Sequence, residues 1–231
     1  MIELKNITKT FGTFKALDDL TLTVPQGAVY GLVGPNGAGK STAIRHMTGV
    51  YKADKGSILL NGQPIYEDDA LKETIGYIPD DIFYYTSATL EDMRRFYRGL
   101  YPKFDDALFA RLCDVFCLPG KTPIRRYSKG MQKQAAFQLT LSTHPEMLIL
   151  DEPVDGLDPV MRRQVMSLIL ADVAERGTTV LISSHNLREL EDVCDHVGIM
   201  DHGKMLLERS LADMQGATVK LQLVGEVPEG L

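Results

Sequence analysis

The chain has 231 residues, 44% of them hydrophobic, with a formal net charge of −6. This length suits one domain, alone or with a subdomain, and the acidic balance argues against nucleic acid as the main partner. The three cysteines form no disulfide framework and fit a reducing compartment, and Cys113 and Cys117, one helical turn apart, are expected to be packing residues.

The N-terminal segment, residues 1–25, alternates between apolar and polar residues, which predicts antiparallel strands with one buried face. Its start does not resemble a signal peptide, and no apolar run approaches the ~20 residues that cross a bilayer. We therefore expect a soluble chain whose membrane spans, if any are needed, belong to another chain. Phe11 precedes the turn between these strands, and its ring either stacks on a purine or packs in the core.

A phosphate-binding loop follows the apolar run 28–33, which predicts a buried parallel strand, and leads into a helix expected from Thr42 to Met47. Its glycines let backbone N–H groups surround a phosphate, next to the positive end of the helix. Lys40 is expected to reach the β- and γ-phosphates, and the Ser41 hydroxyl to bind Mg²⁺. The loop residues are Gly34, Pro35, Asn36, Gly37, Ala38, Gly39, Lys40, Ser41 and Thr42.

The middle of the chain changes from strands to helices. Residues 56–66 contain Asn61-Gly62, a hairpin signal, and a further strand ends at Pro79. A capping-box pattern at Thr89 opens a helical stretch that continues to Ser142. We interpret this stretch as a helical subdomain inserted into an α/β core.

The core resumes with the buried strand 147–150, which delivers Asp151 and Glu152 at its carboxyl end, where α/β sheets bind ligands. Asp151 is expected to hold Mg²⁺, directly or through water, and Glu152 to act as general base. A helix beginning at Asp158 and a buried strand then bring His185 to the same edge. Weaker strands are expected near 197–200, 205–207 and 219–223.

In this order, the motifs resemble the nucleotide-binding subunit of an ABC transporter. The match includes the signature Tyr127-Ser128-Lys129-Gly130-Met131-Gln132, the D-loop Gly156-Leu157-Asp158, the switch histidine His185, and Phe11 at the adenine-stacking position. The resemblance implies an α/β P-loop NTPase core: a mixed, mainly parallel sheet, an N-terminal antiparallel β subdomain and an inserted helical subdomain. The fold class is therefore α/β.

The resemblance extends over residues 1–215, which we expect to form a single ABC ATPase domain. Residues 1–86 and 144–215 form the nucleotide-binding core and residues 87–143 the helical subdomain that carries the signature. Residues 216–231 are a short tail or the start of a truncated extension.

The resemblance also implies a head-to-tail dimer in which ATP with Mg²⁺ lies between the P-loop of one subunit and Ser128 and Gly130 of the other. Ser128 is expected to cap its helix as well. Lys40, Glu152 and His185 are the expected catalytic residues, and Asp158 is counted with the nucleotide-binding residues.

Two positions depart from the family pattern. Met131 replaces the signature glutamine, as in the exporter branch called ABC-2. Asp80 stands where the family has the Q-loop glutamine, and we expect it to be a metal or coupling residue alongside Ser41 and Asp151. A group of basic residues near the signature either attracts triphosphate or forms a solvated face; these are Lys121, Arg125, Arg126, Lys129 and Lys133.

These inferences predict an ATPase that drives transport, in the export direction, through a separate integral-membrane permease. We expect a cytoplasmic protein, peripheral on the inner face of the cell membrane, that forms a homodimer or a heterodimer with a related ATPase subunit and binds no nucleic acid. The alternatives are a soluble ABC-type ATPase acting on DNA or ribosomes, a small-molecule P-loop kinase, and a binding-only regulatory subunit. The transported substrate is not encoded in this chain.

Overall fold

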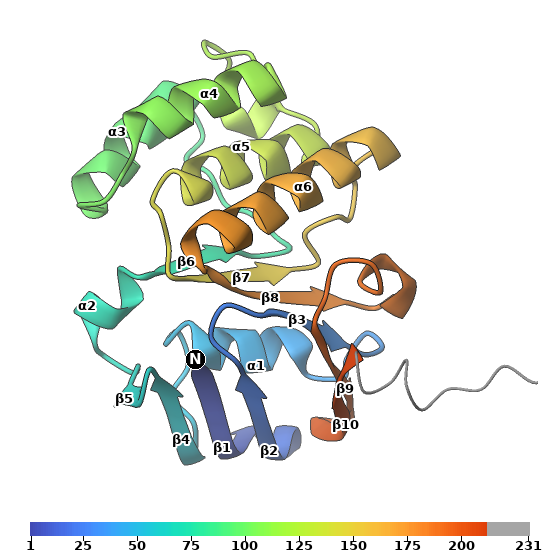
Figure 1. Cartoon of the computed structure of the whole chain (residues 1–231). Helices are drawn as coiled ribbons and strands as arrows, with labels where there is room; N and C mark the ends of the chain where they lie inside the picture. The colour runs from blue at the N-terminus through green and yellow to red at the C-terminus, as the bar shows by residue number, and fades with distance from the viewer. Residues whose placement is uncertain (212–231) are drawn as a thin grey trace, which may run out of the picture.

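Two β-sheets organise the protein, as shown in Figure 1, a computed structural model that describes residues 1–211. The strand expected near 219–223 lies outside the described residues. The first sheet has the order β2-β1-β4-β5, and the second has the order β10-β9-β3-β8-β7-β6. A P-loop-type α/β fold with an added antiparallel sheet is therefore confirmed.

The antiparallel sheet is formed by the N-terminal segment and the predicted hairpin. Its inward side chains Ile2, Leu4 and Ile7 are fully buried, as the alternation predicts. Asn61 and Gly62 both have positive φ, of 50° and 81°, which a tight two-residue hairpin turn requires. The strands are β1 (Ile2–Phe11), β2 (Phe14–Val24), β4 (Lys55–Leu60) and β5 (Gln63–Pro64).

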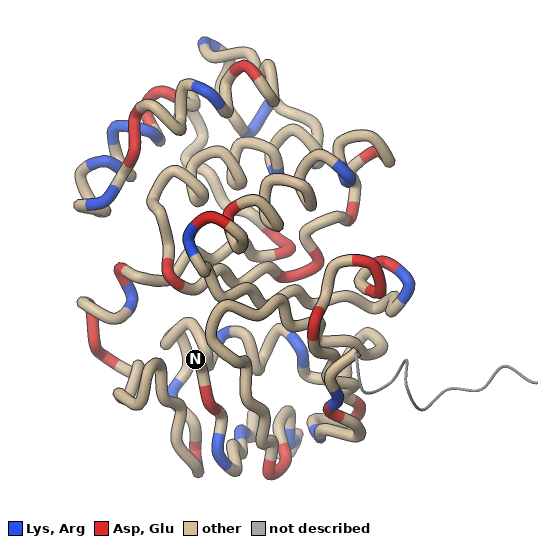
Figure 2. Tube along the Cα trace, viewed as in Figure 1, with Lys and Arg blue, Asp and Glu red and all other residues tan. Residues whose placement is uncertain are grey.

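The second sheet is parallel except for its edge strand β10. Every residue of β3, β7 and β8 is buried, which fits strands covered on both faces. Figure 2 shows few charged residues along these central strands, and their carboxyl ends share one edge. The strands are β3 (Val29–Val33), β6 (Ile75–Ile78), β7 (Met147–Asp151), β8 (Thr179–Ser184), β9 (His196–Asp201) and β10 (Lys204–Ser210).

Helices cover both faces of the second sheet. Helix α1 lies between the two sheets, where Ile44 and Met47 pack with residues of both, while α3 to α6 lie on the other side (Figure 1). The helices are α1 (Lys40–Met47), α2 (Asp69–Lys72), α3 (Leu90–Leu100), α4 (Asp106–Phe116), α5 (Lys129–Leu141) and α6 (Pro159–Arg176). Two 3₁₀ turns, η1 (Ile124–Arg126) and η2 (Leu187–Glu189), complete the described elements.

The helix boundaries follow the capping residues that the sequence predicts. Thr89 forms the expected capping box of α3, and the side chains of Ser128 and Asp158 cap α5 and α6. Gly177 ends α6 in the left-handed conformation. Each cap supplies hydrogen-bond acceptors or a chain reversal where the helix would leave backbone groups unpaired.

The expectation that Cys113 and Cys117 are packing residues is wrong, because both are exposed at the end of α4. The apolar stripe of α4 is carried instead by buried Phe109, Leu112 and Phe116. None of the helices within residues 1–211 has both the length and the apolar character that a membrane span requires.

Candidate active site

The P-loop connects β3 to α1 at the carboxyl edge of the second sheet. Two of its glycines are required by close backbone contacts: a Cβ on Gly34 would lie 2.3 Å from the Met200 carbonyl oxygen, and a Cβ on Gly39 would lie 2.8 Å from that of Ala16. Gly39 also has a φ of +102°, which side-chain-bearing residues rarely adopt. The loop can therefore take this conformation only with glycine at both positions.

A cavity of about 280 Å³ opens beside this loop. It brings the predicted residues Asp80 and Glu152 to the P-loop, although each comes from a different segment of the chain. Phe14 also lines it. The P-loop residues that line the cavity are Pro35, Asn36, Gly37, Ala38, Gly39, Lys40, Ser41 and Thr42.

The two acids at the end of β7 differ in position: the Asp151 side chain is buried, whereas Glu152 lines the cavity. Asp151 is 3% exposed, and its Oδ1 accepts a hydrogen bond of 2.6 Å from the Ser183 hydroxyl. The same hydroxyl accepts a bond of 3.0 Å from the Glu152 N–H. Ser183, which the sequence analysis did not select, therefore fixes both acids relative to the neighbouring strand β8.

Glu152 connects the P-loop lysine to the histidine at the end of β8. Its Oε1 lies 3.3 Å from Lys40 Nζ, and its Oε2 lies 3.1 Å from His185 Nδ1. Glu152 has a φ of +47°, a left-handed conformation uncommon outside glycine that concentrates at functional sites. Lys40 also donates to the Gly34 carbonyl oxygen at 2.6 Å.

Asp80, the expected metal or coupling residue, lines the cavity, but its carboxylate faces two lysines of α5. Its Oδ1 is 3.3 Å from Lys133 Nζ and 3.5 Å from Lys129 Nζ. Of the two alternatives for the basic group, a solvated face is excluded for Lys133, because its side chain is fully buried. Burial lowers the pKa of the Lys133 ammonium, while Asp80 acts in the opposite direction.

Phe11 lies outside the P-loop cavity and is 44% exposed, so it does not pack in the core. Its ring makes an edge contact with Tyr51, at a centroid distance of 5.7 Å, and Lys9 Nζ lies 5.5 Å from its centroid. Phe14, three residues later, lines the cavity and is 63% exposed. In the sequence, Phe14 could have been identified as a second aromatic residue, which follows the Phe11-Gly12 turn.

None of the signature residues lines this cavity, although Lys129 reaches Asp80 at its edge. The Ser128 hydroxyl accepts a hydrogen bond of 3.2 Å from the Met131 N–H. A Cβ on Gly130 would lie 2.8 Å from the Gly156 carbonyl oxygen, so this glycine lets α5 approach the D-loop. Asp158 caps α6 through bonds of 3.0 Å from the N–H groups of Val160 and Met161.

The donor atoms at the cavity fit a magnesium ion. Ser41 and Asp80 line the cavity, and Asp151 lies buried at the end of β7. Hydroxyl and carboxylate oxygens are the ligands that Mg²⁺ prefers. These three residues could hold the ion, although the Asp80 oxygen nearest α5 already faces two ammonium groups.

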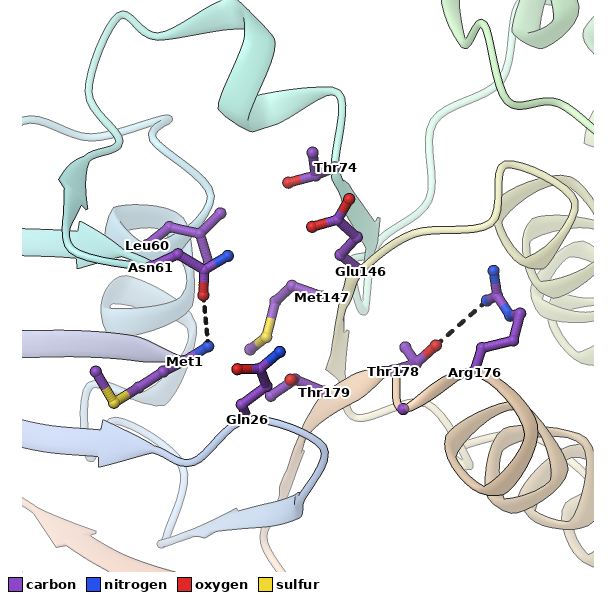
Figure 3. A pocket seen from close by; sticks show the side chains of 11 residues that line it. Met1, Gln26, Leu60, Asn61, Thr74, Glu146, Met147, Arg176, Thr178 and Thr179 are labelled. Atoms are coloured by element: carbon purple, nitrogen blue, oxygen red, sulfur yellow. Dashed lines mark hydrogen bonds between the residues drawn. The ribbon is translucent and has the colours of Figure 1, made fainter.

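Figure 3 shows a second cavity, of about 250 Å³, at the amino ends of β7 and β8. Its charged groups are already paired: the Met1 ammonium donates to Asn61 Oδ1 at 2.8 Å, and the Arg176 guanidinium binds both oxygens of Asp172. Ligands in α/β folds bind at the opposite, carboxyl edge of the sheet. We therefore assign the candidate site to the P-loop cavity.

An exposed aromatic patch follows Asp80 in the chain, and the sequence analysis did not identify it. The patch is Phe83, Tyr85 and Phe96, which are 77%, 59% and 47% exposed. The rings form a continuous series of edge contacts, with centroid distances of 6.0 Å and 6.4 Å. Three neighbouring exposed aromatic residues are a composition typical of protein interfaces.

Comparison with known proteins identifies similar sequences. A family model described as ABC transporter matches residues 17–155. The ABC transporter ATP-binding protein YtrB of Bacillus subtilis is 33% identical over 223 residues, which cover 96% of this chain and 76% of YtrB. The bacitracin transport ATP-binding protein BcrA of Bacillus licheniformis is 33% identical over 211 residues, which cover 90% and 69%.

Solved structures show the same fold. The ATP-binding subunit of an ABC transporter superposes with a TM-score of 0.85 at 28% identity and covers 94% of this chain and 92% of its own. A dimeric ATP-binding cassette bound to ADP and phosphate, in a post-hydrolysis state, has a TM-score of 0.81 at 21% identity, with coverages of 91% and 99%.

Proposed function

Because this chain belongs to the ABC transporter family of ATP-binding proteins, and is therefore an ATPase, we propose that it powers export through a separate membrane permease. The observation that supports this proposal best is the P-loop cavity, where Glu152 lies between Lys40 and His185. The Lys129-Gly130-Met131 signature supports the export direction, as do relatives named for bacitracin and lantibiotic transport.

The residues of the cavity have complementary tasks in this proposal. The P-loop N–H groups and Lys40 bind the phosphates, which draws Lys40 away from Glu152. The freed Glu152 carboxylate accepts a proton from the attacking water, and His185 holds that carboxylate through Nδ1. A magnesium ion held by Ser41, Asp151 and Asp80 would neutralise charge on the phosphates.

A second subunit would complete each nucleotide site. Ser128 and Gly130 lie at the start of α5, outside the P-loop cavity of their own chain. A helix start offers unpaired N–H groups and a partial positive charge, which together bind anions. ATP between the P-loop of one subunit and Ser128 of another would stabilise the dimer by mass action. The partner is a second copy or a related ATPase subunit.

The permease would contact the exposed aromatic patch of Phe83, Tyr85 and Phe96. Phe83 and Tyr85 follow Asp80 closely in the chain, and Phe96 of α3 packs on Tyr85, so a movement at the nucleotide site has a short path to the patch. The proposal keeps the domain division expected from the sequence. In this division, residues 1–86 and 144–215 form the nucleotide-binding core, and residues 87–143 form the helical subdomain. ATP-driven closure of the dimer would move this subdomain and the permease with it, at the inner face of the membrane.

Purification of the full-length chain from its native membranes tests this proposal. We expect a hydrophobic multi-span protein to copurify and the preparation to release phosphate from ATP in the steady state. The variant Phe83→Ser should release phosphate at the normal rate as an isolated chain but lose the membrane partner. Copurification with ribosomes or DNA instead would contradict the proposed role in transport.

A further inference from the structure

A buried lysine on α5 contacts two loops of the catalytic edge. The side chain of Lys133 is fully buried, which is rare for lysine unless its ammonium is paired. The ammonium donates to the backbone carbonyl oxygen of Glu152 and to Asp80 Oδ1. The Asp80 carboxylate and the Glu152 carbonyl oxygen both accept hydrogen bonds, and these bonds offset the cost of burying the ammonium.

The three contacting residues come from separate elements. Asp80 follows β6 and Glu152 follows β7, and these parallel strands are direct neighbours, with Ile78 opposite Leu150. Lys133 comes from the second turn of α5, the helix that Ser128 begins. The single ammonium therefore connects the helix that carries the signature to both strand ends at the P-loop cavity.

The contact with Glu152 acts on its backbone rather than on its carboxylate. The Glu152 N–H is held by Ser183 Oγ at 3.0 Å, and its carbonyl oxygen is held by Lys133. Both peptide groups next to this residue are thereby fixed, and the residue keeps a left-handed φ of +47°. That conformation directs the carboxylate toward Lys40 and His185. Without the lysine, the carbonyl oxygen would keep only the longer bond of 3.3 Å that the Asp155 N–H donates to it.

We propose that Lys133 is a positioning residue for ATP hydrolysis, which fixes the Glu152 backbone and couples its orientation to the position of α5. The inference rests on the proposed role of Glu152 as general base. Asp80 keeps the ammonium paired, and Lys129 lies 3.5 Å from the same Asp80 oxygen. A displacement of α5, as when a second subunit binds at Ser128, would thus change the orientation of the Glu152 carboxylate.

The variant Lys133→Met tests this role because methionine keeps the length of the side chain and removes its donors. We expect kcat to fall between about tenfold and a hundredfold, since small misplacements of a catalytic group have effects of this size. The KM for ATP and the affinity for a fluorescent ATP analogue should stay within about twofold, because no phosphate contact is lost. The variant Lys133→Gln, which keeps a donor, should show an intermediate kcat.

The matched control is Lys103→Met, which removes an exposed lysine paired with Glu146 at 3.0 Å and should leave kcat unchanged. If Lys133→Met does not fold, a normal kcat in folded Lys133→Gln overturns the inference. A normal kcat in folded Lys133→Met, or a loss confined to nucleotide affinity, also overturns it. If the wild-type chain itself releases no phosphate from ATP, the proposed function fails, and the inference fails with it.

Discussion

The Nζ atom of Lys40 lies 3.3 Å from Oε1 of Glu152 inside the P-loop cavity. Both side chains are largely buried, at 6% and 12% exposure, so the pair is poorly screened by solvent. In the proposed mechanism, the same ammonium binds the phosphates. Nucleotide binding would therefore separate this pair and free the carboxylate at the moment when a base is needed.

Replacement of the P-loop lysine should weaken nucleotide binding. Lys40→Ala removes a cation whose hydrogen bonds to phosphate are worth about 1.5–3 kcal/mol, equivalent to roughly a tenfold to hundredfold loss of affinity. Titration with a fluorescent ATP analogue measures this loss. Lys5→Ala, which removes an exposed lysine paired with Glu3 in the antiparallel sheet, should bind normally. Unchanged affinity in Lys40→Ala would refute the assignment.

Replacement of Glu152 should separate binding from turnover. Glu152→Gln keeps the shape of the side chain but cannot accept a proton, so turnover should fall by roughly 10²- to 10⁴-fold. ATP affinity should be retained, and ATP should hold the protein as a dimer that light scattering detects. Glu175→Gln, at an exposed position in α6, is the matched control. A normal turnover rate in Glu152→Gln would remove this residue from its role.

Replacement by alanine should lower the stability of the protein at Gly198 and raise it at Gly99. A Cβ on Gly198 would lie 2.2 Å from the hydroxyl oxygen of Tyr30, which is fully buried and bonded to Glu208 at 2.8 Å. Overpacking of this kind costs about 1–3 kcal/mol, so the melting temperature of Gly198→Ala should fall by roughly 2–12 °C. Gly99, inside α3, has open space, and Gly99→Ala should stabilise by up to about 1 kcal/mol. Equal melting temperatures would contradict this packing.

The sequence was sufficient to predict the elements that carry strong local patterns. The buried runs ending at Val33, Asp151 and Ser184 are parallel strands because their apolar residues leave no solvent-facing side. The chain order of strand and loop then places Lys40 and Glu152 at one edge of the sheet. Their placement needed only the rule that parallel strands share a carboxyl edge.

Other features depend on tertiary contacts that have no local pattern. Lys133 belongs to a run of polar residues and looks like part of a basic surface, yet the Asp80 loop and Glu152 bury it. Cys113 and Cys117 have a helical spacing compatible with packing, but both residues are exposed, and the Cys113 thiol accepts a hydrogen bond from Gln138. Phe14 could not be distinguished from Phe11 as a cavity residue, because the turn between them decides which ring faces the P-loop.

The proposed role of Ser128 in a second subunit can be separated from its role as a helix cap. Ser128→Ala removes the acceptor of the Met131 N–H and should cost about 1 kcal/mol of stability. Ser128→Asp keeps a capping acceptor and adds a negative charge, which should preserve stability but repel the phosphates of a partner. Both variants should lose the ATP-dependent dimer when they are introduced into the Glu152→Gln protein.

The matched control for the cap is Thr89→Ala, because Thr89 caps α3 through the Asp92 N–H at the same distance of 3.2 Å. This variant should lose a similar amount of stability, measured as the melting temperature, and still form the ATP-dependent dimer. Loss of the dimer in a normally stable Ser128→Asp protein would then come from the missing contact with nucleotide rather than from unfolding of α5. A Ser128→Asp protein that dimerises and hydrolyses ATP at the wild-type rate would show that this helix start does not face a partner's nucleotide.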